Sequence, residues 1–134
     1  MGDNAPQAGS LPAGVVELRL PTTPEYIAVL RATAGVIAGE MSFSYDEVIN
    51  LRVAVSEAFM MAASCVSRGE LTARFTIGAG SLEVLIPSPQ AYSNNLHGEG
   101  EVERRALLNS LVDKLELGSG AAGEPIIRML KHRS

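Results

Sequence analysis

The stretch from Ser44 to Gly69 constrains the fold of this chain more than any other. It begins with Ser-Tyr-Asp-Glu, in which Ser44 and Glu47 have the spacing of a helix capping box and the two acidic residues favour the positive end of the helix dipole. Apolar residues then recur at helical spacing, namely Val48, Leu51, Val55, Phe59 and Ala62. Because further apolar residues lie beside this stripe, we expect a helix that runs to about Ser67 and is buried on more than one face.

A strand and another amphipathic helix are predicted before this stretch. Residues 15–20 alternate apolar and polar side chains, as a half-buried strand does. Thr23 and Pro24 are suited to begin a helix, with Thr23 as its cap. The buried side of this helix is predicted to consist of Ile27, Leu30, Ala34 and Ile37, and its end to fall near residue 39.

Four strands and one helix are predicted after it. The strands are expected at 71–77, 81–87, 115–117 and 125–131, and a glycine-containing loop joins the first two as a hairpin. A long loop is expected over 88–100, and a helix over 101–114. The predicted buried residues of that helix are Val102, Leu107, Leu108 and Leu111.

The order of these elements predicts the fold class. One strand, two helices, two strands, one helix and two strands fit a two-layer α/β sandwich. The chain of 134 residues has room for one domain. We place this domain at residues 14–134 and interpret residues 1–13, which are polar with Gly and Pro, as a flexible N-terminal tail.

The composition argues against several classes of function. The formal net charge of −4 argues against a dedicated nucleic-acid binder. Apolar runs are interrupted within about 18 residues, so we expect no membrane span and no secretory signal, and we expect a cytoplasmic protein. The single cysteine, Cys65, and the two histidines, His97 and His132, form no cluster with metal-ligand spacing, so no metal site is expected.

Two features remain that chemistry could use. Glu57 shares a helix face with Met61 and Ser64, and a carboxylate among apolar residues needs a partner or a cavity, unless it is simply exposed. Gly98 and Gly100 precede the last predicted helix, where backbone N–H groups can hold a phosphate. The glutamates around these glycines repel an anion, however, so a surface loop is the favoured interpretation from the residues alone.

With these residues in view, the chain resembles the anti-sigma factor/serine-protein kinase family (RsbW-like) of the histidine-kinase-like ATPase superfamily. The resemblance lies in VELRLPTTPEYIAVLR and DEVINLRVAVSEAFMMAA, and less specifically in ALLNSLVDKLEL and EPIIRMLK. It implies the Bergerat fold, a mixed sheet covered on one face by helices. It also implies a protein that binds an alternative sigma factor and releases it to an anti-anti-sigma factor, which many members phosphorylate with Mg-ATP.

The resemblance assigns roles to individual residues. Glu57 matches the glutamate that acts on the attacking group or its water. Met61 stands where the family has an asparagine that binds Mg²⁺, and Cys65 stands where histidine is common. Arg31 matches an arginine that contacts both the sigma factor and the antagonist, a role that suits a guanidinium because it can bind carboxylates through two hydrogen bonds. The alternative for Arg31 is an ordinary solvated arginine.

The nucleotide-binding motifs depart from the family pattern in three places. The thioether of Met61 is a poor ligand for Mg²⁺, which prefers oxygen. Ser88 follows the strand 81–87, where the family has an aspartate that recognises adenine, and a hydroxyl does not replace that acceptor. The glycine box is broken, with Val102 and Arg104 near its glycine positions. Met61, Ser88, Gly98 and Gly100 are therefore interpreted as positions of a degenerate pocket.

We therefore expect an anti-sigma-factor-like binding protein that acts in partner switching without ATP and, by resemblance, forms a homodimer through a sheet edge. An alternative is an ATP-dependent serine/threonine protein kinase that uses Glu57 and an unconventional Mg²⁺ site. A third is a non-enzymatic scaffold in a signalling complex. No interpretation involves nucleic acid or a membrane as a direct partner.

Overall fold

The computed structural model describes residues 11–64, 69–87, 101–119 and 125–134. Along the chain the elements are β1 (Gly14–Pro21), the 3-10 helix η2 (Pro24–Tyr26), α1 (Ile27–Glu40), α2 (Tyr45–Ala63), β2 (Glu70–Ile77), β3 (Ser81–Pro87), α4 (Glu101–Leu111), β4 (Lys114–Ser119) and β5 (Pro125–His132). The order of strands and helices is the predicted one. The main difference is at the start of the first helix, where Thr23 precedes a 3-10 turn and its side chain makes no capping hydrogen bond.

The five strands form one sheet in the order β1-β2-β3-β5-β4. Every neighbouring pair is antiparallel, so the two-layer α/β class is confirmed but the expectation of a mixed sheet is wrong. The reason is the number of chain reversals between strands. The chain reverses three times between β1 and β2, into α1, into α2 and into β2, so β2 returns antiparallel to β1. β3 and β4 run in the same direction, but β5 lies between them and is antiparallel to both.

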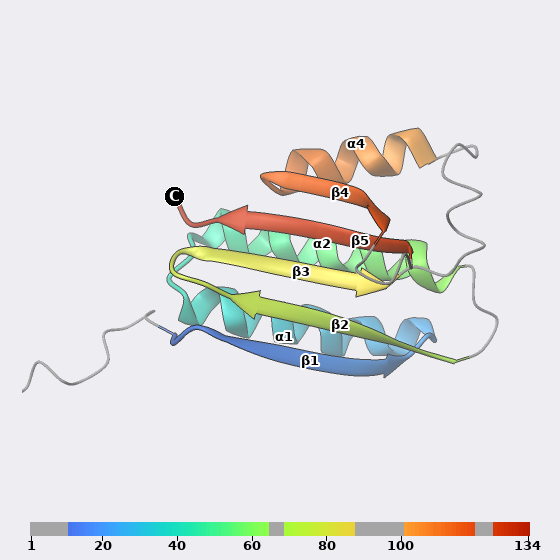
Figure 1. Cartoon of the computed structure of the whole chain (residues 1–134), viewed down its shortest axis with the longest axis horizontal. Helices are drawn as coiled ribbons and strands as arrows, with labels where there is room; N and C mark the ends of the chain where they lie inside the picture. The colour runs from blue at the N-terminus through green and yellow to red at the C-terminus, as the bar shows by residue number, and fades with distance from the viewer. Residues whose placement is uncertain (1–10, 65–68, 88–100, 120–124) are drawn as a thin grey trace, which may run out of the picture.

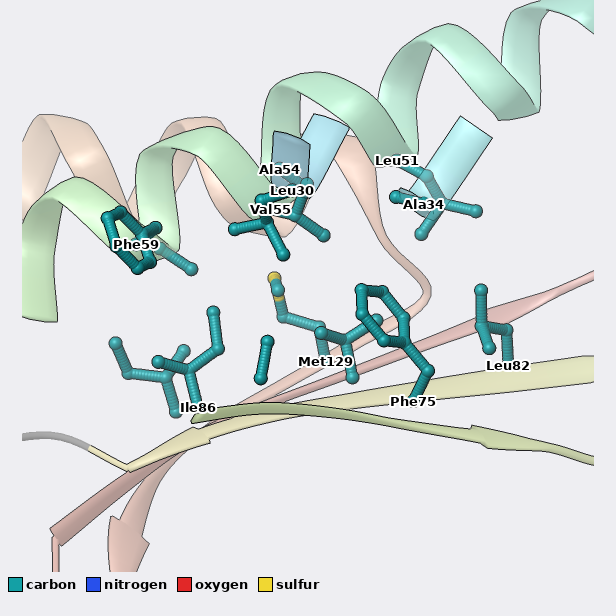
Figure 2. Packing of buried hydrophobic residues seen from close by; sticks show 14 of the residues in the cluster. Leu30, Ala34, Leu51, Ala54, Val55, Phe59, Phe75, Leu82, Ile86 and Met129 are labelled. Carbon is teal, nitrogen blue, oxygen red and sulfur yellow. The ribbon is translucent and has the colours of Figure 1, made fainter. Parts of the chain in front are cut away.

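The helices α1 and α2 lie side by side behind the sheet and cover one face of it (Figure 1). Side chains from both layers meet in a continuous core, in which Leu30, Val55 and Phe59 approach Phe75, Ile86 and Met129 of the strands (Figure 2). All four residues predicted for the buried side of α1 are buried. Burial of this apolar surface is the main source of stability for such a sandwich.

Burial of α2 follows the prediction only in part. Four residues of its predicted stripe, Leu51, Val55, Phe59 and Ala62, are buried, together with Ala54 and Met61 beside it. Val53 and Met60 are each 39% exposed, because α2 contacts α1, α4 and the sheet but leaves its outer side to solvent. The described part of α2 ends at Ala63, with Ser64 as its C-cap, and the predicted end near Ser67 lies outside the described residues.

The prediction for the last helix was wrong at two positions. Val102 and Leu107 are 68% and 39% exposed, whereas Leu108 is fully buried and Leu111 is half-buried. Helix α4 lies at the border of the helical layer and contacts only α2 and β4 closely, so it buries one narrow line of side chains (Figure 1). The helix ends at Leu111, and the backbone N–H of Asp113 already donates to Leu130 O of β5 at 2.9 Å.

The beginning of the described chain also differs from the expected tail. Leu11 is half-buried and packs against the core, so the folded region includes it. Residues 1–10 of the predicted tail lie outside the described residues.

Candidate functional site

The capping box predicted at the start of α2 is present and fixes how this helix lies. The backbone N–H of Glu47 donates to Ser44 Oγ at 3.2 Å, and the N–H of Ser44 donates to Glu47 Oε1 at 2.7 Å. These bonds satisfy two N–H groups that a helix leaves unpaired at its start. The hydrogen bond from the Ser44 backbone is the largest influence lowering the pKa of Glu47, and it outweighs the burial that would raise it.

Glu57 and Met61 lie one helical turn apart on α2. Glu57 is half-buried, whereas Met61 is completely buried in the hydrophobic core. Ser64, which follows at the C-cap, donates from Oγ to Met61 O at 2.8 Å. The sulfur of Met61 is thus enclosed by apolar neighbours at the position where the family resemblance places a Mg²⁺ ligand.

The other predicted positions of the nucleotide pocket lie outside the described residues. These are Ser88, Gly98 and Gly100, and the same holds for Cys65. Of the residues near the expected glycine box, Val102 and Arg104 are exposed on α4. The described chain therefore includes the α2 side of the predicted pocket but not its loop.

Arg31 is exposed on α1. Ile27, Arg31 and Gly35 follow one another at intervals of four residues, so they lie roughly along one side of α1. Gly35 lies against the side chain of Arg52 from α2, and a Cβ at position 35 would stand 3.3 Å from Arg52 Cδ. The absence of a side chain at Gly35 leaves room for the aliphatic stem of Arg52 to lie across α1.

A pocket of about 190 Å³ opens at the other end of this helix pair. Thr22 and Pro24 contribute from the segment between β1 and α1, and Ile27 from the start of α1. The other lining residues come from the end of α2, namely Phe59, Met60, Ala63 and Ser64. Thr22 is held in place because both its backbone N–H and its Oγ1 donate to Gly69 O, at 3.1 and 3.3 Å. The wall of the pocket is mostly apolar.

The open face of the sheet, opposite the helices, carries paired charges. Arg128 of β5 forms ion pairs with two glutamates: its Nε lies 3.3 Å from Oε2 of Glu83 on β3, and its Nη1 lies 3.1 Å from Oε1 of Glu116 on β4. Nζ of Lys114 lies 3.4 Å from Oε2 of Glu116. Lys114 and then Arg128 lower the pKa of Glu116. In the described ranges, no three His, Cys, Asp or Glu side chains gather closely enough to hold a metal ion.

Neither the contact of Arg52 with α1 nor the pocket was predicted from the sequence. Phe59 was predicted as part of the apolar stripe of α2, but that pattern does not indicate that the two helix ends leave a hollow. Gly35 within a helix was the one available signal, since an isolated helical glycine often marks a close approach of another element. It does not identify the approaching residue.

No protein-family model matches the chain. The serine-protein kinase RsbW of Bacillus licheniformis is 34% identical over 89 residues, which are 63% of this chain and 55% of that protein. RsbW of Bacillus subtilis (strain 168) is 35% identical over 78 residues, which are 55% of this chain and 49% of that protein. The matched part therefore spans only about half the length of these relatives.

A solved structure extends the likeness to the fold. The crystal structure of the RsbU and RsbW domains of a Mycobacterium tuberculosis protein matches with a TM-score of 0.68 at 14% identity, over 91% of this chain and 33% of that chain. The fold is thus that of an RsbW-type α/β domain. Together with the sequence relatives, this confirms the predicted resemblance to RsbW-type proteins.

Among the described helices, none has both the length and the apolar character needed to cross a membrane.

Proposed function

We propose that this protein is an anti-sigma-factor-like regulator that binds and sequesters an alternative sigma factor without ATP. An anti-anti-sigma factor would compete for the same surface and release the sigma factor, as in partner switching. The similarity to RsbW serine-protein kinases supports the assignment of partners. The observation that carries the independence from ATP is the complete burial of Met61.

The physical argument concerns the metal. Mg²⁺ in nucleotide sites is bound by oxygen ligands and by the phosphates themselves. At position 61 this chain places a thioether, a soft ligand, and encloses it in the core, where an ion would also lose its hydration shell. Loss of the metal ligand weakens the hold on the triphosphate, and the substitutions expected at Ser88 and in the glycine box act in the same direction.

Calorimetric titration of the full chain with ATP and with ADP, each with Mg²⁺, tests this part of the proposal. We expect neither heat of binding nor thermal stabilisation at millimolar nucleotide. Micromolar binding would contradict the proposal and favour the kinase interpretation.

The sigma-factor part is tested separately. Each alternative sigma factor of the source organism would be purified and titrated against the full chain, with Arg31→Gln as the variant. We expect one of them to form a stable complex, and Arg31→Gln to weaken it about 10-fold, as expected for loss of a hydrogen-bonded charge. If no sigma factor binds while another protein co-purifies, the scaffold interpretation replaces this one.

A protein kinase is the second candidate function, and the half-buried carboxylate of Glu57 on α2 is the observation in its favour. In that case Mg-ATP would donate its terminal phosphate to a serine or threonine of the antagonist, leaving ADP, and Glu57→Gln would abolish the transfer. Transfer that survives Glu57→Gln would remove the only residue named for catalysis.

The homodimer expected from the resemblance belongs to the same proposal. The two edge strands, β1 and β4, are the places where a sheet can be extended by a second copy. Sedimentation equilibrium of the purified chain would measure the mass in solution. A strictly monomeric protein at high micromolar concentration would contradict the dimer.

A further inference from the structure

The pocket at the ends of α1 and α2 and the two arginines beside these helices form one elongated surface, which we call the α1–α2 groove. The hollow itself is the pocket at Ile27 and Ala63. From this pocket the surface follows the helix pair past the exposed Arg31 to Arg52, whose side chain lies against Gly35. A helix rises about 1.5 Å per residue, so Arg31 and Gly35 lie roughly 6 and 12 Å along α1 from Ile27.

The apolar end of the groove is built to receive a side chain. Its volume of about 190 Å³ far exceeds the roughly 10–15 Å³ that one water needs, so the pocket has room for an apolar side chain. Met60 borders it and is 39% exposed, although it is a large apolar residue. Flexible methionine side chains adapt to an incoming apolar group, so covering Met60 and filling the pocket would both remove apolar surface from water.

The charged end of the groove favours an occupant with acidic groups. Arg31 and Arg52 are both exposed, and within the described part of the chain neither guanidinium has an ion-pair partner. By contrast, Arg19, Arg74 and Arg128 of the sheet are all paired with glutamates. Two unpaired arginines in line with an apolar pocket favour an occupant that carries carboxylates at matching positions.

We propose that the α1–α2 groove binds an acidic amphipathic helix of the partner protein. An apolar side chain of that helix fills the pocket, and carboxylates about one and two turns further along pair with Arg31 and Arg52. Packing of a helix into a groove through side chains at such spacings is a common mode of peptide recognition. The inference rests on the proposed function as a partner-binding protein, but its test does not require a sigma factor.

The probe is a synthetic helical peptide of about five turns with one leucine followed, four and eight residues later, by glutamate. Binding to the full chain would be followed by NMR of labelled methyl groups, with Ile27, Met60 and Ala63 as reporters. We expect saturable shifts confined to these methyls, and no saturable shift with a peptide in which lysine replaces both glutamates. The absence of saturation at millimolar peptide, or equal binding of the lysine peptide, would overturn the proposal.

Three variants separate the two ends of the groove. Ala63→Leu fills the pocket, and Arg31→Gln and Arg52→Gln each remove one charge; every change is expected to weaken the peptide about 10-fold. Arg19→Gln removes an exposed arginine from the opposite face and is the matched control, expected to change nothing. Thermal unfolding of each variant shows whether the fold is intact. If Ala63→Leu does not fold, the smaller change Ala63→Val takes its place. Equal affinity of a folded Ala63 variant would overturn the assignment of the pocket.

Failure of this inference is distinguishable from failure of the proposed function. A sigma factor that binds Ala63→Leu as tightly as the unaltered chain would leave the function standing and overturn the groove. Saturable peptide binding in the groove, with no sigma factor bound by the protein, would support the groove and overturn the identity of the partner.

Discussion

The backbone N–H of Ser134 donates a 2.9 Å hydrogen bond to Oε2 of Glu47, eighty-seven residues earlier in the chain. The same carboxylate accepts from the Ser44 backbone through Oε1, so one side chain both caps α2 and holds the chain end that follows β5. The neighbouring Arg133 donates to Met41 O at 2.8 Å. These contacts join the last strand to the connection between the two large helices.

Glu47→Gln should destabilise the protein by about 1 kcal/mol at neutral pH, since it removes a charged partner from the capping box. Because the hydrogen bonds lower the pKa of Glu47 below its ordinary value of 4.5, its ionised form stabilises the folded state above that value. This stability is lost as the pH falls through the folded-state pKa. Urea unfolding from about pH 7 down to about pH 3 should show that the difference in stability between variant and parent shrinks. As a control at neutral pH, Glu40→Gln changes an exposed residue and should alter the stability by no more than about 0.5 kcal/mol.

Met61→Asn restores the residue type that the family resemblance expects at this position, yet we predict that it does not restore nucleotide binding. The amide would enter a fully buried apolar site, and an unsatisfied buried polar group costs about 1–3 kcal/mol. Unfolding measurements should show this loss, and calorimetry with Mg-ATP should show no heat. A stable variant that binds Mg-ATP would mean that Met61 alone blocks the pocket.

Phe75→Ala should destabilise the protein by about 3–5 kcal/mol, because Phe75 is fully buried between the sheet and the helices (Figure 2). Val102→Ala is the contrasting change, since Val102 is 68% exposed on α4, and it should alter stability by no more than about 0.5 kcal/mol. Urea unfolding of both variants checks the pair. A large effect of Val102→Ala would show that α4 is covered in solution.

Arg128→Met keeps the aliphatic stem but leaves Glu83 and Glu116 without their shared cation on the open face of the sheet. We expect a lower midpoint of thermal unfolding at low ionic strength. The difference from the parent should shrink in about 0.5 M salt, where exposed charges are strongly screened. A salt-independent loss would point to packing of the arginine stem instead of its charge.

Much of the fold could be predicted because it rests on local patterns. The capping box at Ser44, the apolar stripe from Leu51 to Phe59 and the hairpin of 71–77 with 81–87 each depend on neighbours within a few residues, and all three are confirmed. The exposure of Val102 and Leu107 could not be predicted in this way. An apolar pattern shows which side of a helix favours burial, but not whether another layer is present to cover it.

The same distinction between local pattern and tertiary packing applies to the candidate site. The sequence determined which chemical groups are available: Arg31 and Glu57 on helices, and a thioether at position 61 where a metal ligand is expected. Only the tertiary structure decided that the sulfur of Met61 is enclosed, that Arg52 crosses α1 at Gly35, and that a pocket opens between Ile27 and Ala63. Local periodicity fixes which side of each helix a residue occupies, but the distance between two helices depends on how all their side chains pack together against the sheet.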